Sequence, residues 1–132
     1  MEIKDKTIVI TGGASGIGRA MARRFTNEGA KQIVIADLNA DGLQVVADEI
    51  GARAIPTNVS VEAEVKHLIE TAEHDYGQID LLCNNAGIGV GGGPETPNED
   101  WQRIWEINVM AHVYAARAAI PAMVARGDGY IM

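Results

Sequence analysis

Three glycines, Gly12, Gly16 and Gly18, lie between a short apolar run and a helical pattern. The run Thr7–Ile10 is β-branched and apolar, as in a strand buried on both faces of a parallel sheet. From Ile17 onward apolar residues recur every four positions, as on one face of a helix. Where a strand leads through a glycine turn into a helix, the helix N-terminus presents unpaired N–H groups and the positive end of its dipole. Glycines in the turn let a pyrophosphate approach the backbone closely. The pattern predicts a dinucleotide site; the alternative is a turn that only joins strand to helix.

A carboxylate, Asp37, ends the next apolar run, Gln32–Ala36, about 20 residues beyond Gly18. A carboxylate at this place hydrogen-bonds a ribose 2′-OH, and its charge repels the extra phosphate of NADP. Neither lysine nor arginine lies next to it in the sequence or within the glycine turn. The sequence therefore predicts NAD in preference to NADP. Alternatively, Asp37 or Asn39 caps a helix that begins near Ala40.

Two adjacent asparagines, Asn84 and Asn85, follow the apolar run Ile79–Cys83 and precede Ala86 and Gly87. Amides that leave a buried strand are costly unless they find hydrogen-bond partners. We expect them to tie neighbouring strand ends together and to line a cleft. The alternative is an ordinary loop, since asparagine and glycine favour turns.

A further amide, Asn108, lies within an apolar helical face that also carries Trp101, Ile104, Trp105 and His112. A polar amide in such a stripe needs buried partners. Asn108 is either a functional group or a satisfied core amide. We assign Trp101, Trp105 and His112 to packing.

Strand-like and helix-like segments alternate along the whole chain. This order predicts an α/β fold, a doubly wound parallel sheet of order 3-2-1-4-5, with a cofactor cleft between strands 1 and 4. The expected strands lie near residues 7–10, 32–36, 52–56, 79–83 and 129–132, and the expected helices begin near residues 17, 40, 62 and 99, the last reaching about residue 125.

Composition narrows the class of protein. A length of 132 residues supports one domain, and a net charge of -7 argues against nucleic-acid and acidic-membrane partners. The single cysteine, Cys83, leaves no intrachain disulfide and fits a reducing compartment, and Met1–Lys6 shows no secretory signal. Polar residues and a proline interrupt the apolar run Val109–Ala125, so we expect no membrane span. The expected location is cytoplasmic, and we expect no metal site.

The glycine turn that begins at Thr11 and the segment Asn84–Gly87 together resemble the short-chain dehydrogenase/reductase family, whose fold is Rossmann-like. The resemblance implies an NAD(P)-dependent oxidoreductase that transfers hydride between an alcohol and a ketone. It also places Asn108 in a catalytic group of Asn, Ser, Tyr and Lys, where the amide holds a helix distortion and a water. The cofactor-binding residues that it implies are Gly12, Ser15, Gly16, Ile17, Gly18, Asp37, Leu38, Asn58, Val59, Asn85, Ala86 and Gly87.

The pair Asn58–Val59 departs from the family pattern, which carries Asp-Val at this place. The family's acid accepts a hydrogen bond from the adenine amino group. An asparagine carbonyl can also accept it, without the charge-assisted part. We expect a weaker adenine anchor; the alternative is that Asn58 caps the following helix.

The rest of the family's catalytic group has no counterpart in this sequence. The only serines are Ser15 and Ser60, the last lysine is Lys66, and no tyrosine has a lysine four residues later. We therefore expect residues 1–132 to be a single NAD-binding domain that covers the amino-terminal half of the family's fold and ends within strand 5. By itself this chain is expected to be inactive.

Two functions from different classes remain. One is a dehydrogenase present as its cofactor-binding half, acting on a small alcohol or carbonyl compound. The family's long helix usually forms an oligomer interface, so a homo-oligomer, a dimer or a tetramer, is expected of the complete protein. The other is a dinucleotide-binding module or pseudoenzyme without chemistry.

Overall fold

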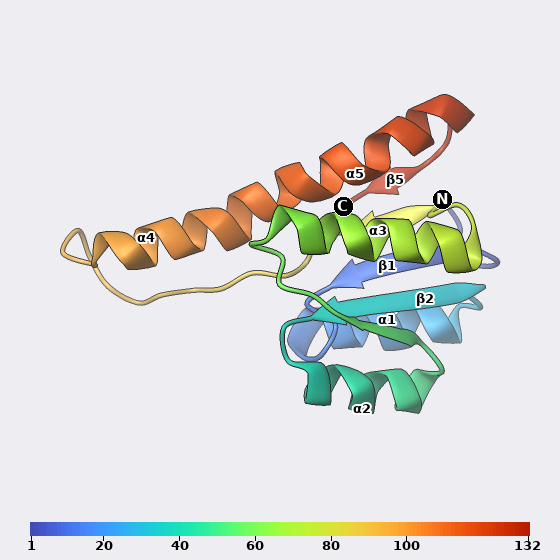
Figure 1. Ribbon diagram of the computed structural model, residues 1–132. Helices are drawn as coiled ribbons and strands as arrows, with labels where there is room; N and C mark the ends of the chain where they lie inside the picture. Colours follow the sequence, from blue (N-terminus) through green and yellow to red (C-terminus); the bar gives the residue numbers. More distant parts are fainter.

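The computed structural model describes residues 1–132 and shows a five-stranded parallel sheet with helices on both faces (Figure 1). The strand order is β3-β2-β1-β4-β5, as predicted from the alternation of elements. Every pair of neighbouring strands is parallel. The strands are β1 (Thr7–Thr11), β2 (Gln32–Asp37), β3 (Arg53–Pro56), β4 (Leu81–Cys83) and β5 (Tyr130–Ile131).

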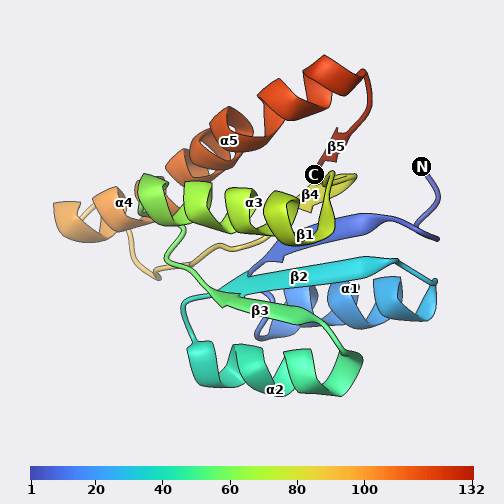
Figure 2. The same cartoon turned by 45° about the vertical axis from the view of Figure 1, so that its right-hand side comes forward.

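The helices form two layers, one on each face of this sheet (Figures 1 and 2). Helices α1 (Gly16–Asn27) and α2 (Ala40–Ile50) cover one face. On the other lie α3 (Glu62–Tyr76) and a long run made of α4 (Asn98–Trp105), a π-helical segment η1 (Glu106–Met110) and α5 (Ala111–Arg126). The expected helix positions are therefore confirmed.

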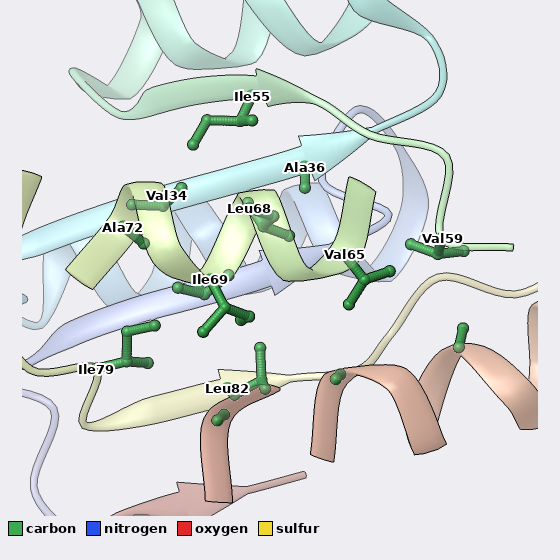
Figure 3. Packing of buried hydrophobic residues seen from close by; sticks show 14 of the residues in the cluster. Val34, Ala36, Ile55, Val59, Val65, Leu68, Ile69, Ala72, Ile79 and Leu82 are labelled. Carbon is green, nitrogen blue, oxygen red and sulfur yellow. The ribbon is translucent and has the colours of Figure 1, made fainter. Parts of the chain in front are cut away.

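Strand β1 lies at the centre of the sheet and is buried along its whole length. Because successive strand residues point to opposite faces, Val9 packs with the α3 layer, whereas Ile8 and Ile10 pack with the α1 and α2 layer. Figure 3 shows Leu68 and Ile69 of α3 among the side chains that fill the α3 side of the sheet. One strand thus contributes to both cores.

The long helical run buries a stripe of small residues rather than its aromatic residues. Ala111, Ala115 and Ala119 face the core together with Met123, and they bring α5 close to α3. The assignment of Trp101, Trp105 and His112 to packing was wrong: the two tryptophans are 55% and 54% exposed, and the histidine is exposed as well. Two features explain the difference. Helix α4 extends beyond the sheet in both views (Figures 1 and 2), and the wider turns of η1 change the phase of the helix before α5 begins.

By length and composition alone, the run Asn98–Arg126 is also long and apolar enough to cross a membrane. Buried core helices can pass this same test, and 22% of the most apolar window here is buried. The expected lack of a membrane span therefore stays a prediction.

Candidate functional site

A cleft of about 380 Å³ opens at the carboxyl ends of β1, β2, β3 and β4. All the residues assigned to the cofactor from the sequence line it, except Gly18. Three further residues were missed, namely Thr57, Ile88 and Ile107; each is a sequence neighbour of a predicted residue, and that adjacency was the available signal. The complete lining consists of Gly12, Ser15, Gly16, Ile17, Asp37, Leu38, Thr57, Asn58, Val59, Asn85, Ala86, Gly87, Ile88 and Ile107.

The glycine turn between β1 and α1 leaves its backbone open to the cleft. Gly16 has a φ of +52°, and a Cβ at this position would meet nothing within 4 Å. The N-cap residue Ser15 makes no side-chain hydrogen bond to the helix, and the first turn carries no acidic residue. The N–H groups at this helix end therefore have no side-chain acceptor, and the residues that carry them, Gly16 and Ile17, line the cleft. This arrangement fits a phosphate.

Gly18 lies just behind the cleft and closes the turn. A Cβ on Gly18 would fall 2.1 Å from the carbonyl oxygen of Gly12, too close for any side chain. Gly18, which the sequence assigned to the cofactor, is buried in the first turn of α1 and does not line the cleft. Its contribution is close packing of the helix against the turn.

The carboxylate of Asp37 connects the end of β2 to the glycine turn. Its Oδ2 accepts a hydrogen bond from the Ala14 N–H at 3.1 Å, and its Oδ1 accepts from the Asn39 N–H at 3.0 Å. The capping of α2 is done by Asn39, whose side chain accepts from the Gly42 N–H at 3.1 Å. A carboxylate offers about four acceptor positions, so Asp37 retains capacity for a hydroxyl group in the cleft.

The segment with the two asparagines, which follows β4, is tied to the end of β1 by hydrogen bonds. The Asn85 side-chain amide donates to the Thr11 carbonyl at 2.9 Å. In return, Thr11 Oγ1 accepts from the backbone N–H groups of Asn85 and Ala86, both at 3.0 Å. These bonds join the end of β1 to the end of β4 and fix the floor of the cleft. Asn84 donates its own N–H to the Met132 carbonyl.

Asn108 lies in the π-helical segment η1 and contacts the chain that leaves β4. Its Oδ1 accepts from the Ile88 N–H at 2.9 Å, and its Nδ2 donates to the Ile88 carbonyl at 2.8 Å. A Cβ on Gly87 would lie 3.3 Å from the Asn108 Oδ1. The half-buried amide is therefore satisfied, and its neighbours Ile88 and Ile107 line the cleft while Asn108 itself does not.

Asn58 is arranged differently from the sequence expectation. Its Oδ1 already accepts two hydrogen bonds from Ser60, from the N–H at 3.1 Å and from the Oγ at 2.7 Å. The expectation that this carbonyl is available to an adenine amino group is therefore not met. The alternative, that Asn58 caps the following helix, is also not met, because the N-cap residue of α3 is Val61. Asn58 instead orders the turn that leads into the helix.

Two titratable groups are buried, and neither faces the cleft. Burial raises the pKa of the Cys83 thiol to about 11, which leaves it neutral and unreactive at physiological pH. Asp80 precedes β4, at the opposite end of the strand from the cleft. Burial acts to raise the pKa of Asp80, but hydrogen bonds from the Thr7 N–H, Lys6 and Gln78 outweigh it and hold the pKa below its ordinary value. Both groups belong to the scaffold.

Comparison with known proteins gives a consistent result. The profile of the short chain dehydrogenase family matches residues 6–132. A 1-deoxy-11-beta-hydroxypentalenate dehydrogenase of Streptomyces exfoliatus is 39% identical over 135 residues, which cover 96% of this chain and 49% of the relative. An uncharacterized oxidoreductase of Staphylococcus aureus is 34% identical, over 98% of this chain and 58% of the relative.

Among solved structures, a short chain dehydrogenase/reductase from Burkholderia phymatum in complex with NAD superimposes with a TM-score of 0.93 at 35% identity. The match covers 99% of this chain and 49% of that one. The chain thus spans about half the length of the relatives that it matches.

Proposed function

Because the chain belongs to the short-chain dehydrogenase family, we propose that it forms the NAD-binding part of an oxidoreductase that interconverts alcohols and carbonyl compounds. The observation that carries the proposal is the cleft itself. One cavity is lined by the open glycine turn, by the carboxylate at the end of the next strand, and by the segment that the Asn85 amide ties to β1. These are the features that a dinucleotide needs for its pyrophosphate and ribose.

The pyrophosphate, the adenosine ribose and the adenine base each have a matching part of the cleft. The pyrophosphate is assigned to the N–H groups around Gly16 at the start of α1, and the adenosine ribose to Asp37. The base extends toward Leu38 and Val59, and Leu38 is 74% exposed and free to cover an aromatic ring. When bound, the dinucleotide supplies or accepts the hydride. The residues of this chain bind and orient it.

We assign NAD rather than NADP as the cofactor. With the adenosine ribose assigned to Asp37, a 2′-phosphate would meet its carboxylate, and the cleft lining includes no arginine or lysine that could offset the repulsion. Two like charges in contact cost several kcal/mol in a site of low dielectric, whereas a hydroxyl group gains a charge-assisted hydrogen bond.

For catalysis, we propose that Asn108 contributes through its place in the π-helical segment, by holding that distortion and a water beside the cleft. A proton must still reach or leave the substrate oxygen, and general acid help is worth about 10²–10⁴-fold. The cleft lining includes neither a tyrosine nor a lysine. We therefore propose that this chain alone binds the cofactor without turnover. The same observation favours a second candidate, a dinucleotide-binding module without chemistry.

The remaining assignments follow the family. We propose that residues 1–132 form one domain and that the substrate is a small alcohol or carbonyl compound, without nucleic-acid or membrane partners. The exposed Trp101 and Trp105 on α4 support a homo-oligomer, because large aromatic residues are enriched at interfaces. The buried, unpaired Cys83 supports a cytoplasmic location.

Isothermal titration of the chain with NAD, NADP and ADP-ribose tests the proposal. We expect NAD and ADP-ribose to bind and NADP to bind more weakly. A panel of alcohols with NAD should give no NADH above background. Failure of NAD and ADP-ribose to bind would refute the assignment of the cleft, and turnover by this chain would refute the assignment of its catalytic residues.

A further inference from the structure

The side chain of Asn58 has only one of its two ends free of protein partners. Its carbonyl oxygen accepts from both the N–H and the Oγ of Ser60, at 3.1 Å and 2.7 Å. An amide oxygen has two acceptor positions, so both are used inside the protein. The amide nitrogen, Nδ2, donates to no protein group. Asn58 also lines the cleft.

The orientation of this amide is fixed by chemistry. The Ser60 N–H is a donor and cannot donate to the amide nitrogen, so a flipped Asn58 would place two donors against each other. The backbone of Asn58 is held as well, because its N–H donates to Glu64 Oε2 at 2.6 Å. The free edge of Asn58 is therefore a hydrogen-bond donor.

The sheet order places this donor at the base end of the cleft. The ends of β1, β2 and β3 follow one another along the sheet edge, and they carry the glycine turn, Asp37 and Asn58 in that order. The Thr57 N–H donates to the Asp37 carbonyl at 2.9 Å, which brings Asn58 beside the ribose position. A dinucleotide with its pyrophosphate at the turn and its ribose at Asp37 would extend its base toward Asn58. This step rests on the proposed function.

We propose that Asn58 reads the base of the dinucleotide as a hydrogen-bond donor, and that Ser60 sets this selection by occupying the amide carbonyl. A donor pairs with a ring nitrogen or with a carbonyl on the base, and it does not pair with an exocyclic amino group. The site therefore takes a 6-carbonyl purine, hypoxanthine, at least as well as adenine. Selectivity for adenine over hypoxanthine is weak in this chain.

Two dinucleotides and two variants test this inference by binding alone. The Kd values of NAD and of nicotinamide hypoxanthine dinucleotide are measured by isothermal titration against the 132-residue chain. In Asn58→Asp one carboxylate oxygen keeps the Ser60 bonds and the other faces the cleft as an acceptor. In Ser60→Ala the N–H of residue 60 still donates, but one acceptor position of Asn58 is freed.

For the wild type we expect the hypoxanthine dinucleotide to bind within about threefold of NAD, or more tightly. Asn58→Asp should shift the ratio of the two Kd values toward NAD by about 3- to 10-fold. The reason is that an acceptor replaces the donor, and an acceptor pairs with the adenine amino group instead of the hypoxanthine carbonyl. Ser60→Ala should shift it in the same direction by less.

A wild type that favours NAD by more than about tenfold overturns the inference, as does an unchanged ratio in both variants. In each of these cases dinucleotides still bind, so the proposed function stands. If neither dinucleotide binds the wild type, the proposed function itself is refuted, and this inference falls with it. The two failures are therefore distinguishable.

Discussion

Asn108 and Ile88, 20 positions apart, form a closed pair of hydrogen bonds in which one side-chain amide satisfies both backbone groups of one residue. Ile88 lies beyond Cys83, the last residue of β4 that pairs with β1, so its backbone has no sheet partner. Asn108 replaces that partner. The pair fixes where the chain leaves the sheet and therefore fixes one wall of the cleft.

The first prediction concerns this pair. Asn108→Asp keeps an acceptor for the Ile88 N–H but has no donor for the Ile88 carbonyl. We expect a loss of about 1–3 kcal/mol in the free energy of unfolding, the cost of an unsatisfied half-buried group. Urea unfolding followed by circular dichroism measures it. The same change at Asn98, exposed in the first turn of α4, is the control and should be neutral or slightly stabilising. Equal effects in the two variants would contradict the role given to Asn108.

A second prediction concerns the glycine turn. Gly18→Ala would place a Cβ 2.1 Å from the Gly12 carbonyl oxygen, so the turn and α1 must move apart. Overpacking of this kind costs about 1–3 kcal/mol, and the shift should also remove NAD binding. Gly89→Ala is the matched control, because a Cβ there meets nothing within 4 Å. Thermal unfolding and titration calorimetry provide the two measurements. Retention of wild-type stability and NAD affinity in Gly18→Ala would argue against the close packing.

A third prediction concerns cofactor choice at Asp37. The double variant Asp37→Ser with Leu38→Arg removes the repelling carboxylate and adds a cation at an exposed position. The ratio of the Kd values for NADP and NAD should change by at least about tenfold in favour of NADP, or 1.4 kcal/mol. Leu38→Arg alone keeps the carboxylate and should retain much of the preference for NAD. The role of Asp37 is wrong if the unmodified chain binds both cofactors equally.

A fourth prediction concerns pH and the buried carboxylate Asp80. Its folded-state pKa lies below the unfolded value of about 3.9, so ionised Asp80 stabilises the fold above about pH 4. That stabilisation is lost as the pH falls through the lowered folded-state pKa. Asp80→Asn should therefore cost about 1–3 kcal/mol at pH 7 and progressively less below pH 4.

Urea unfolding from pH 7 to pH 3 checks this dependence, with Asp128→Asn as the control. Asp128 is exposed, and its side chain makes no hydrogen bond within the chain, so the control should follow the wild type at every pH. A constant difference between Asp80→Asn and the wild type across the whole range would contradict the assignment.

The sheet order and part of the cleft lining were predictable because both follow from local rules, whereas the other lining residues came from the family resemblance. Parallel strands that alternate with helices leave one natural order, and polar residues or glycines at strand ends collect at one edge of the sheet. Thus Gly12, Asp37 and Asn85 were found from their positions alone.

Other features depended on contacts that no periodicity encodes. The exposure of Trp101 and Trp105 follows from how far α4 extends past the sheet, and the buried face of α5 is marked by alanines, which carry little hydrophobic signal. The commitment of the Asn58 carbonyl to Ser60 depends on one rotamer in one turn. These features are determined by tertiary contacts, which the sequence pattern does not show.

Strand β1, whose side chains alternate between the two cores, makes the layers thermodynamically inseparable. Detaching the α1 and α2 layer uncovers Ile8 and Ile10, and detaching the opposite layer uncovers Val9 on the same five-residue strand. Partial unfolding would thus expose apolar surface on the central strand, at about 25 cal/mol per Å². The helical layers should melt in one cooperative transition, with the β1 amides among the last to exchange with solvent.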